Sequence, residues 1–166
     1  GDVRAVIDSP ELTRCRDAAA EAVENAPSGG TVSTGGTAEF AAVRAAIDVP
    51  LLLDADALKV LAEDSAARAA VASRTSPTLL TPHDGEYSLL KGAPPRPDRV
   101  AAARELADQL QCTVPLKGPT TVVAGPDGPT FVIGHGDERL ATAGSGDVLA
   151  GMIGALLAAG VGPEPA

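Results

Sequence analysis

Residues 49–58, VPLLLDADAL, decide the fold class. The apolar run at 49–53 predicts a strand that is covered on both faces, as strands of parallel sheets are. Asp54 and Asp56 end this run abruptly. Polar side chains directly after a buried strand are of interest, because ligands of open parallel sheets bind beyond the carboxyl ends of the strands.

Strand-like and helix-like segments alternate on both sides of this stretch. We expect strands at residues 3–7, 31–32, 78–80, 113–117, 121–124 and 130–133, and helices at 12–25, 38–47, 58–73, 86–91, 98–111 and 146–159. The 58–73 helix should break near Asp64-Ser65, and the turn Pro126-Asp127-Gly128 predicts a hairpin late in the chain. Strands separated by helices favour a parallel sheet flanked by helices. The sequence therefore predicts one α/β domain over residues 1–166.

The composition excludes several classes of partner. Hydrophobic residues make up 45% of the 166 residues and charged residues 21%, as in an ordinary globular protein. One Tyr, two Phe and no Trp provide no base-stacking platform, and a net charge of −9 provides no basic footprint, so we expect no nucleic acid partner. No apolar run reaches the ~20 residues of a membrane span. Cys15 and Cys112 have no C-x-x-C spacing, which favours a reducing compartment and a cytoplasmic location.

Three polar segments follow predicted strands and should meet at one edge of the sheet. The first holds Asp54 and Asp56, the second is residues 81–86 with His83, and the third is residues 117–121. The beginning of the last helix is expected at the same edge. This convergence predicts a ligand site there.

The stretch Gly144-Ser145-Gly146-Asp147 predicts an anion site at the beginning of the last helix. Unpaired amides and the helix dipole favour an anion there, and small residues let the backbone approach phosphate oxygens. A carboxylate repels phosphate, so Asp147 is a candidate base that deprotonates a hydroxyl attacking phosphorus. The alternative is that Asp147 only caps the helix.

The other candidates also have two interpretations each. Asp54 and Asp56 could bind Mg²⁺ through water or anchor a substrate hydroxyl, or they could merely end a strand and cap the next helix. His83 could donate a hydrogen bond to a ligand, although a single histidine is more often structural. Lys117, one of three lysines, could face a nucleotide phosphate or could extend from a strand end to solvent. His135, in an expected exposed turn, receives no role.

Four stretches, taken in order, resemble the ADP- or ATP-dependent NAD(P)H-hydrate dehydratases, repair enzymes of the ribokinase-like superfamily. They are LLLDADAL, LTPHDGE, LKGPTTVVAGPDG and ATAGSGDVLAGMIGALLAAG, and they span residues 51–160. A sugar or vitamin kinase of the same superfamily would share the Gly-x-Gly-Asp pattern but not the Thr-Pro-His and Asp-Ala-Asp-Ala stretches. The resemblance implies a three-layer α/β/α sandwich with a mostly parallel central sheet.

The resemblance also implies a reaction and a set of roles. The substrate would be the S epimer of hydrated NADH or NADPH, whose C6 hydroxyl is phosphorylated by ADP or ATP with Mg²⁺ and then eliminated as phosphate. Asp147 would be the base. The implied roles of the other residues are substrate binding by Gly35, Asp54, His83 and Asp147, nucleotide binding by Lys117, Gly118, Pro119, Thr120, Thr121 and Gly146, and an anion hole at Gly144, Ser145 and Gly146. A homo-oligomer of four or more subunits and a functional link to an NAD(P)H-hydrate epimerase are also implied.

The chain departs from the family pattern in four places. It has Asp84 where the family usually has Pro, Ser145 where it has Thr, and Gly35 in place of a Gly-Pro-Gly turn. It also lacks family segments at both ends, so the domain is expected to be incomplete. Two other functions remain open: a ribokinase-like kinase for a small alcohol, and an inactive nucleotide-binding remnant.

Overall fold

The computed structural model describes residues 49–136 and 138–163 of the chain. These residues belong to one compact unit, Val49–Ala166. The elements predicted at residues 3–47, and the candidate Gly35, lie outside the described residues. That the whole chain forms a single domain stays a prediction.

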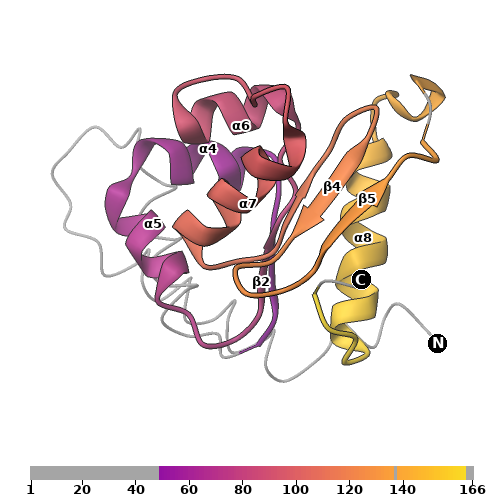
Figure 1. Cartoon of the computed structure of the whole chain (residues 1–166). Coiled ribbons are helices and arrows are strands. Elements are labelled where there is room, and N and C mark those ends of the chain that lie inside the picture. Colours follow the sequence, from indigo (N-terminus) through magenta and orange to yellow (C-terminus); the bar gives the residue numbers. More distant parts are fainter. Residues whose placement is uncertain (1–48, 137, 164–166) are drawn as a thin grey trace, which may run out of the picture. The chain divides into compact units, whose positions relative to one another are not determined.

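Three short strands run in parallel at the centre of the unit (Figure 1). Strand β1 (Leu51–Leu53) pairs with β2 (Thr78–Leu80), with Leu52 opposite Leu79. The amide of Leu80 donates to the Thr113 carbonyl at 2.9 Å, which places β3 (Val114–Leu116) beside β2. The run of parallel strands therefore has the order β1, β2, β3.

An antiparallel hairpin extends the sheet from β3. Strand β4 (Thr121–Ala124) pairs with β3 on one side and with β5 (Thr130–Ile133) on the other. The predicted hairpin is confirmed, and both of its strands have the predicted bounds. The described sheet is thus parallel over β1–β3 and antiparallel over β4 and β5.

Helices cover both faces of this sheet. They are α4 (Asp56–Glu63), α5 (Ser65–Ala72), α6 (Asp84–Lys91), α7 (Arg99–Leu110) and α8 (Ser145–Ala158), with a 3-10 turn at Glu138–Leu140. Figure 1 shows α4–α7 on one side of the strands and α8 on the other. The predicted α/β class and its layers are confirmed.

The predicted break in the 58–73 helix is confirmed, and its cause is a cap. The carboxylate of Asp64 accepts hydrogen bonds from the amides of Ala66, at 2.8 Å, and Ala67, at 3.2 Å. An aspartate that caps its own following amides is a strong helix start, so α5 begins anew at Ser65.

The core has a part on each face of the sheet. Because Leu52 and Leu79 are opposite each other, their side chains share one face, where they pack with Ile153 and Leu157 of α8. Helix α7 packs on β3 and β4 from the other side, with Leu106 fully buried. These two contacts hold α7, the strand ends and α8 in one unit.

Strand β1 is shorter than predicted. Val49 and Pro50 are exposed, and pairing begins at Leu51, whose amide donates to the Pro77 carbonyl at 2.9 Å. Proline has no amide hydrogen, so Pro50 cannot join the ladder.

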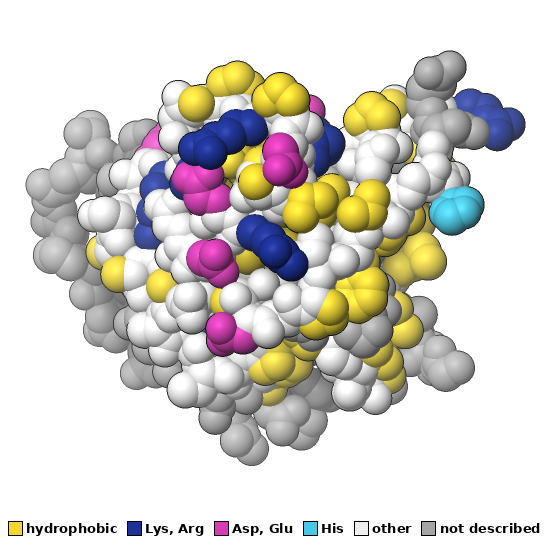
Figure 2. Space-filling model, in the orientation of Figure 1, with side chains coloured by type: hydrophobic (Ala, Val, Ile, Leu, Met, Phe, Trp, Pro, Cys, Tyr) yellow, Lys and Arg dark blue, Asp and Glu magenta, His cyan; other side chains and the backbone are white. Residues whose placement is uncertain are grey.

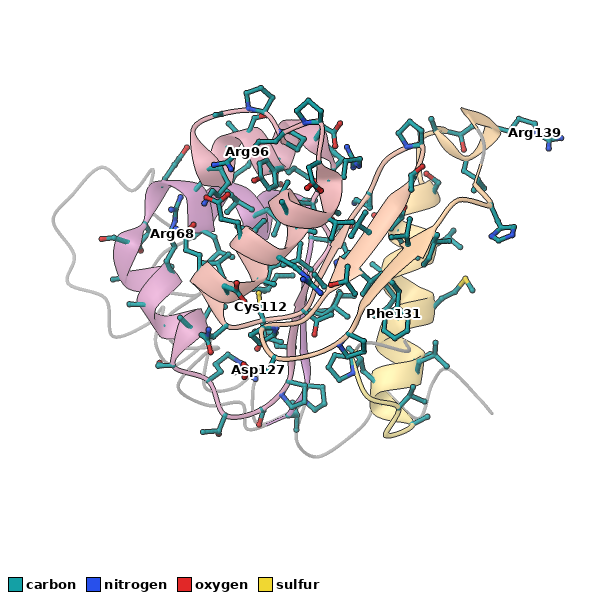
Figure 3. The ribbon with its side chains drawn as sticks, in the orientation of Figure 1. Arg68, Arg96, Cys112, Asp127, Phe131 and Arg139 are labelled. Atoms are coloured by element: carbon teal, nitrogen blue, oxygen red, sulfur yellow. The ribbon has the colours of Figure 1, made fainter. Side chains whose placement is uncertain are left out.

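Exposed apolar side chains gather on β5 and α8. Figure 2 shows them on this side of the molecule, whereas the charged side chains on the same face lie mainly over α4–α7. Phe131, labelled in Figure 3, projects from β5 and is 43% exposed. The exposed large apolar side chains of these two elements are Phe131, Val132, Ile133, Val148, Leu149, Met152 and Leu156. No helix in the described part of the chain is long and apolar enough to cross a membrane.

Candidate active site

Backbone hydrogen bonds align the carboxyl ends of the three parallel strands. The amide of Thr81 donates to the Leu53 carbonyl at 3.2 Å, and the amide of Lys117 donates to the Pro82 carbonyl at 2.8 Å. The residues that follow the strands, among them Asp54, His83 and Lys117, therefore lie along one edge. The three polar segments singled out in the sequence do meet.

A salt bridge between Asp54 and Lys117 crosses the end of β2. The ammonium nitrogen of Lys117 lies 3.0 Å from Oδ1 of Asp54, and the two side chains are only 21% and 18% exposed. Limited exposure makes such a pair stronger than a surface pair, because water screens it less. Its lysine is held at the edge of the sheet instead of extending to solvent.

The beginning of α8 lies at the same edge. A Cβ built on Gly146 would be 3.7 Å from Oδ2 of Asp54, so the first turn of α8 approaches the salt bridge closely. The hydroxyl of Ser145 donates to the Thr142 carbonyl at 2.8 Å and is turned away from the helix amides. Gly144, with φ at 85°, adopts the left-handed conformation that glycine favours and supplies no side-chain cap.

Two amides at this helix start are available for an anion. Within the described residues, the Ser145 amide donates to the Thr142 carbonyl and the Val148 amide to the Gly144 carbonyl. The amides of Gly146 and Asp147 have no acceptor within a helix. Asp147 is exposed in this first turn. The predicted anion hole and the predicted base therefore adjoin each other and are open to solvent.

His83 is the N-cap of α6. Its Nδ1 accepts hydrogen bonds from the amides of Gly85, at 3.0 Å, and Glu86, at 3.3 Å. The Glu86 carboxylate accepts one from the His83 amide at 2.9 Å, which completes a capping box. Because Nδ1 is an acceptor, the ring hydrogen must be on Nε2. Nε2 is thus the donor of this ring; it lies 3.5 Å from Oε2 of Glu86, and the histidine side chain is 59% exposed.

The capping role of His83 was missed in the sequence. The available signal was the spacing His-x-x-Glu before an apolar run, since Glu at the third helical position is typical of a capping box. Gly85 belongs to the same arrangement, because a Cβ there would lie 2.9 Å from Cε1 of the imidazole. The histidine is fixed in place as well as exposed.

Residues 117–120 form a loop whose backbone carbonyls accept hydrogen bonds from Arg99. Gly118 and Pro119 are exposed, whereas Lys117, Thr120 and Thr121 are half-buried. Arg99 donates to the carbonyls of Lys117 and Thr120, at 3.0 and 3.2 Å, and it also pairs with Asp84. Arg99 had no predicted role. The sequence did contain a signal for a special role of Arg99: it is a cation in the first turn of a helix, where the dipole disfavours positive charge.

Asp56 has a different environment from Asp54. It is exposed and accepts a hydrogen bond from Lys59 at 2.6 Å, which lowers the pKa of the Asp56 carboxyl below its usual range. Ala55, between the two acids, has φ at 51° and ψ at −117°, a strained conformation for a residue with a side chain. Asp54 pairs with Lys117 and Asp56 with Lys59, so the two carboxylates have different partners.

The described residues fit a metal ion only if the ligand brings part of its coordination shell. No group of three His, Cys, Asp or Glu side chains gathers among them. Mg²⁺ commonly takes one or two carboxylates together with substrate phosphates, and Asp147 is exposed beside the predicted anion site. The donor set thus suits a metal carried by a nucleotide better than a permanent metal site.

Comparisons with known proteins identify the relatives of this chain. The model of a family described as NAD(P)H-hydrate dehydratase matches residues 31–165. The bifunctional NAD(P)H-hydrate repair enzyme Nnr of Mycobacterium tuberculosis is 56% identical over 114 residues, which are 69% of this chain and 24% of that enzyme. The ADP-dependent (S)-NAD(P)H-hydrate dehydratase of Neisseria meningitidis is 47% identical over 69% of this chain and 39% of its own length.

A solved structure of an NAD(P)H-hydrate dehydratase also matches this chain. The Bacillus subtilis ADP/ATP-dependent NAD(P)H-hydrate dehydratase, crystallised with ATP and Mg²⁺, matches with a TM-score of 0.62 and 36% identity, covering 74% of this chain and 43% of that one. The predicted α/β fold is confirmed by this likeness. The chain covers between 24% and 43% of the length of these relatives, which is less than half of each.

Proposed function

The chain belongs to the NAD(P)H-hydrate dehydratase family, and we propose that it carries the active-site edge of an enzyme that repairs hydrated NADH and NADPH. One observation supports this most: the ends of β1, β2 and β3 and the start of α8 bring a fixed histidine, a shielded lysine and an exposed aspartate to one edge. This edge offers a cation and helix amides to an adenine nucleotide, and a hydrogen-bond donor and a carboxylate to a second nucleotide that carries a hydroxyl.

Asp147 is the proposed base of the reaction. It takes the proton of the C6 hydroxyl of the S-hydrate while that oxygen attacks the terminal phosphorus of ADP or ATP. The C6–O bond then breaks as the lone pair of the ring nitrogen forms a double bond to C6, and inorganic phosphate leaves. Loss of a proton from C5 restores the dihydronicotinamide. With ADP, the net products are NADH or NADPH, AMP and phosphate.

The proposed nucleotide site lies between the 117–121 loop and the first turn of α8. The amides of Gly146 and Asp147 receive the phosphate whose charge the helix dipole favours, with Gly144 and Ser145 completing the anion hole. Lys117 can exchange Asp54 for a phosphate oxygen, since its ammonium already lies at this edge. Mg²⁺, when bound with the nucleotide, neutralises part of the phosphate charge.

The proposed substrate site lies on the His83 side of the same edge. Nε2 of His83 lies 3.5 Å from Oε2 of Glu86 on a side chain that is 59% exposed, and its hydrogen is the one proposed to be donated to the hydrated dinucleotide, because Nδ1 is occupied by the cap. Asp54 accepts from a substrate hydroxyl in this proposal, and Gly35, outside the described residues, lines the site by resemblance. In this proposal the other charged and polar groups bind the two nucleotides, and Asp147 alone removes the proton of the C6 hydroxyl.

A single assay tests this proposal against its two alternatives. The protein is incubated with enzymatically hydrated NADH and either ADP or ATP, and recovery of the dihydronicotinamide absorbance is followed. Repair with nucleotide consumption supports the dehydratase. Nucleotide consumption only with another small alcohol supports a kinase, and thermal stabilisation by nucleotide without any turnover supports a binding remnant.

Substitution of the proposed base sharpens the test. Asp147→Asn should abolish turnover and leave nucleotide affinity equal or higher, because a charge that repels phosphate is removed. Asp127→Asn, in the exposed turn of the hairpin, is the matched control and should retain turnover. If Asp147→Asn still repairs the substrate, another group is the base.

Assembly, location and partners are part of the same proposal. The Mycobacterium tuberculosis relative is named a bifunctional repair enzyme, which supports a functional link to an epimerase. Assembly into a tetramer or larger oligomer and a cytoplasmic location remain predictions. Size-exclusion chromatography with light scattering measures the first directly.

A further inference from the structure

The guanidinium of Arg99 joins two loops of the candidate site. Nη1 donates to both carboxylate oxygens of Asp84, at 2.8 and 3.1 Å. Nε donates to the Thr120 carbonyl at 3.2 Å, and Nη2 donates to the Lys117 carbonyl at 3.0 Å. One planar group therefore connects the residue after His83 to both ends of the 117–120 loop.

The contact with the 117–120 loop is too close for a side chain to intervene. A Cβ on Gly118 would lie 2.5 Å from Nη2 of Arg99 and 3.0 Å from its Cζ. The guanidinium, 19% exposed, thus lies directly against the loop backbone. Any displacement of this loop must move Arg99 or break its hydrogen bonds.

Arg99 contributes little to the helix that carries it. It is the first residue of α7, where a positive charge opposes the dipole, and the cap of this helix is Asp98, which accepts from the Ala101 amide at 3.0 Å. A forked, planar donor matches a carboxylate and several carbonyls at once, which a lysine cannot do. The contacts of Arg99 thus serve the two loops and not the helix.

Asp84 passes the connection on to His83. It is the first residue of α6 and follows His83 directly, so its position sets the first turn whose amides hold the imidazole. We propose that Arg99 and Asp84 are positioning residues that couple the two loops, so that an adenine nucleotide on the 117–121 loop raises affinity for the dinucleotide at His83. This inference rests on the function proposed above.

Binding measurements with ADP and NADH test the coupling. NADH has no C6 hydroxyl, so the two ligands can occupy the site together without reacting, and NADH fluorescence reports its binding. For the unmodified protein, saturating ADP should lower the Kd of NADH by a factor between about 5 and 150. In Asp84→Ala and in Arg99→Lys this factor should fall below about 3, whereas the Kd of ADP alone should change little in Asp84→Ala.

A control and a kinetic measurement separate coupling from general damage. Glu105→Ala removes an acid from the same helix, one that pairs with Lys91 at 2.8 Å, and should retain the full factor. In turnover, Asp84→Ala should raise the KM for hydrated NADH with little change in kcat. If both variants turn over the substrate and keep the coupling factor of the unmodified protein, the inference is wrong and the proposed function stands. An unmodified protein that binds neither ligand overturns the function, and the inference with it.

Discussion

The two proposed roles of His83, as a helix cap and as a substrate contact, can be separated by comparing two substitutions. His83→Ala removes both the Nδ1 acceptor and the Nε2 donor. His83→Asn retains an acceptor that suits an N-cap, since Asn is among the best capping residues, but a shorter side chain no longer reaches the ligand. The first should lose stability and activity, and the second only activity.

The expected magnitudes follow from the hydrogen bonds. In His83→Ala the amides of Gly85 and Glu86 lose their acceptor, and loss of an N-cap typically costs about 1 kcal/mol. For a chain of this length that corresponds to a fall in Tm of about 2–4 °C. In His83→Asn the change should stay within about 0.5 kcal/mol. Loss of one hydrogen bond to the substrate lowers kcat/KM by about tenfold in both variants.

Thermal unfolding and the repair assay measure the two effects independently. Equal destabilisation by Asn and Ala would show that the cap does not hold α6. Full kcat/KM in His83→Asn would remove His83 from the substrate site. Gly85→Ala is a third, independent variant, because its Cβ would press on the imidazole from 2.9 Å without changing the histidine itself. Gly85→Ala should lower kcat/KM, as the two substitutions of His83 do.

Three further predictions concern the backbone and the buried thiol. Ala55→Gly should raise the free energy of unfolding by about 1 kcal/mol in denaturant titrations, because glycine relieves the strain at φ 51°; a loss of stability would contradict the assigned conformation. Gly144→Ala should cost about 1–2 kcal/mol by the same measurement, with Gly144→Asn less affected, because Asn tolerates a positive φ better. Burial raises the pKa of the Cys112 thiol to about 12, and Figure 3 shows this residue in the interior. In a Cys15→Ala background, a disulfide reagent at pH 8 should therefore label Cys112 only after denaturant is added. Stability should also fall as the pH rises above about 8.5, because the unfolded thiol then ionises while the folded one keeps its proton.

Local signals account for the parts of the fold that were predicted correctly. The bounds of β4 and β5 follow from a Pro-Asp-Gly turn between two β-branched runs, and the break before Ser65 follows from an aspartate that caps the next amides. Each depends on residues within a few positions of one another. The prediction for β1 extended beyond its observed start at Leu51, because an apolar run does not show that Pro50 has no amide hydrogen for the ladder.

The candidate site was only partly predictable, since its parts meet through tertiary contacts. The rule that ligands bind beyond the carboxyl ends of parallel strands brought Asp54, His83 and Lys117 to one edge. It did not pair Asp54 with Lys117, 63 positions away, because spacing along the chain does not say which cation faces which acid. The roles given to these residues in catalysis remain predictions.

Arg99 and Ala55 were not predicted as parts of the site, and each of them breaks a local rule. Arg99 places a positive charge in the first turn of a helix, and Ala55 adopts a conformation that a side chain disfavours. Both flank the carboxyl ends of the strands, where Arg99 holds the 117–120 loop and Ala55 separates Asp54 from Asp56. A fold tolerates such local conflicts where tertiary contacts or function compensate for them. Two such conflicts meet at the edge where the function is proposed, and this agrees with that proposal.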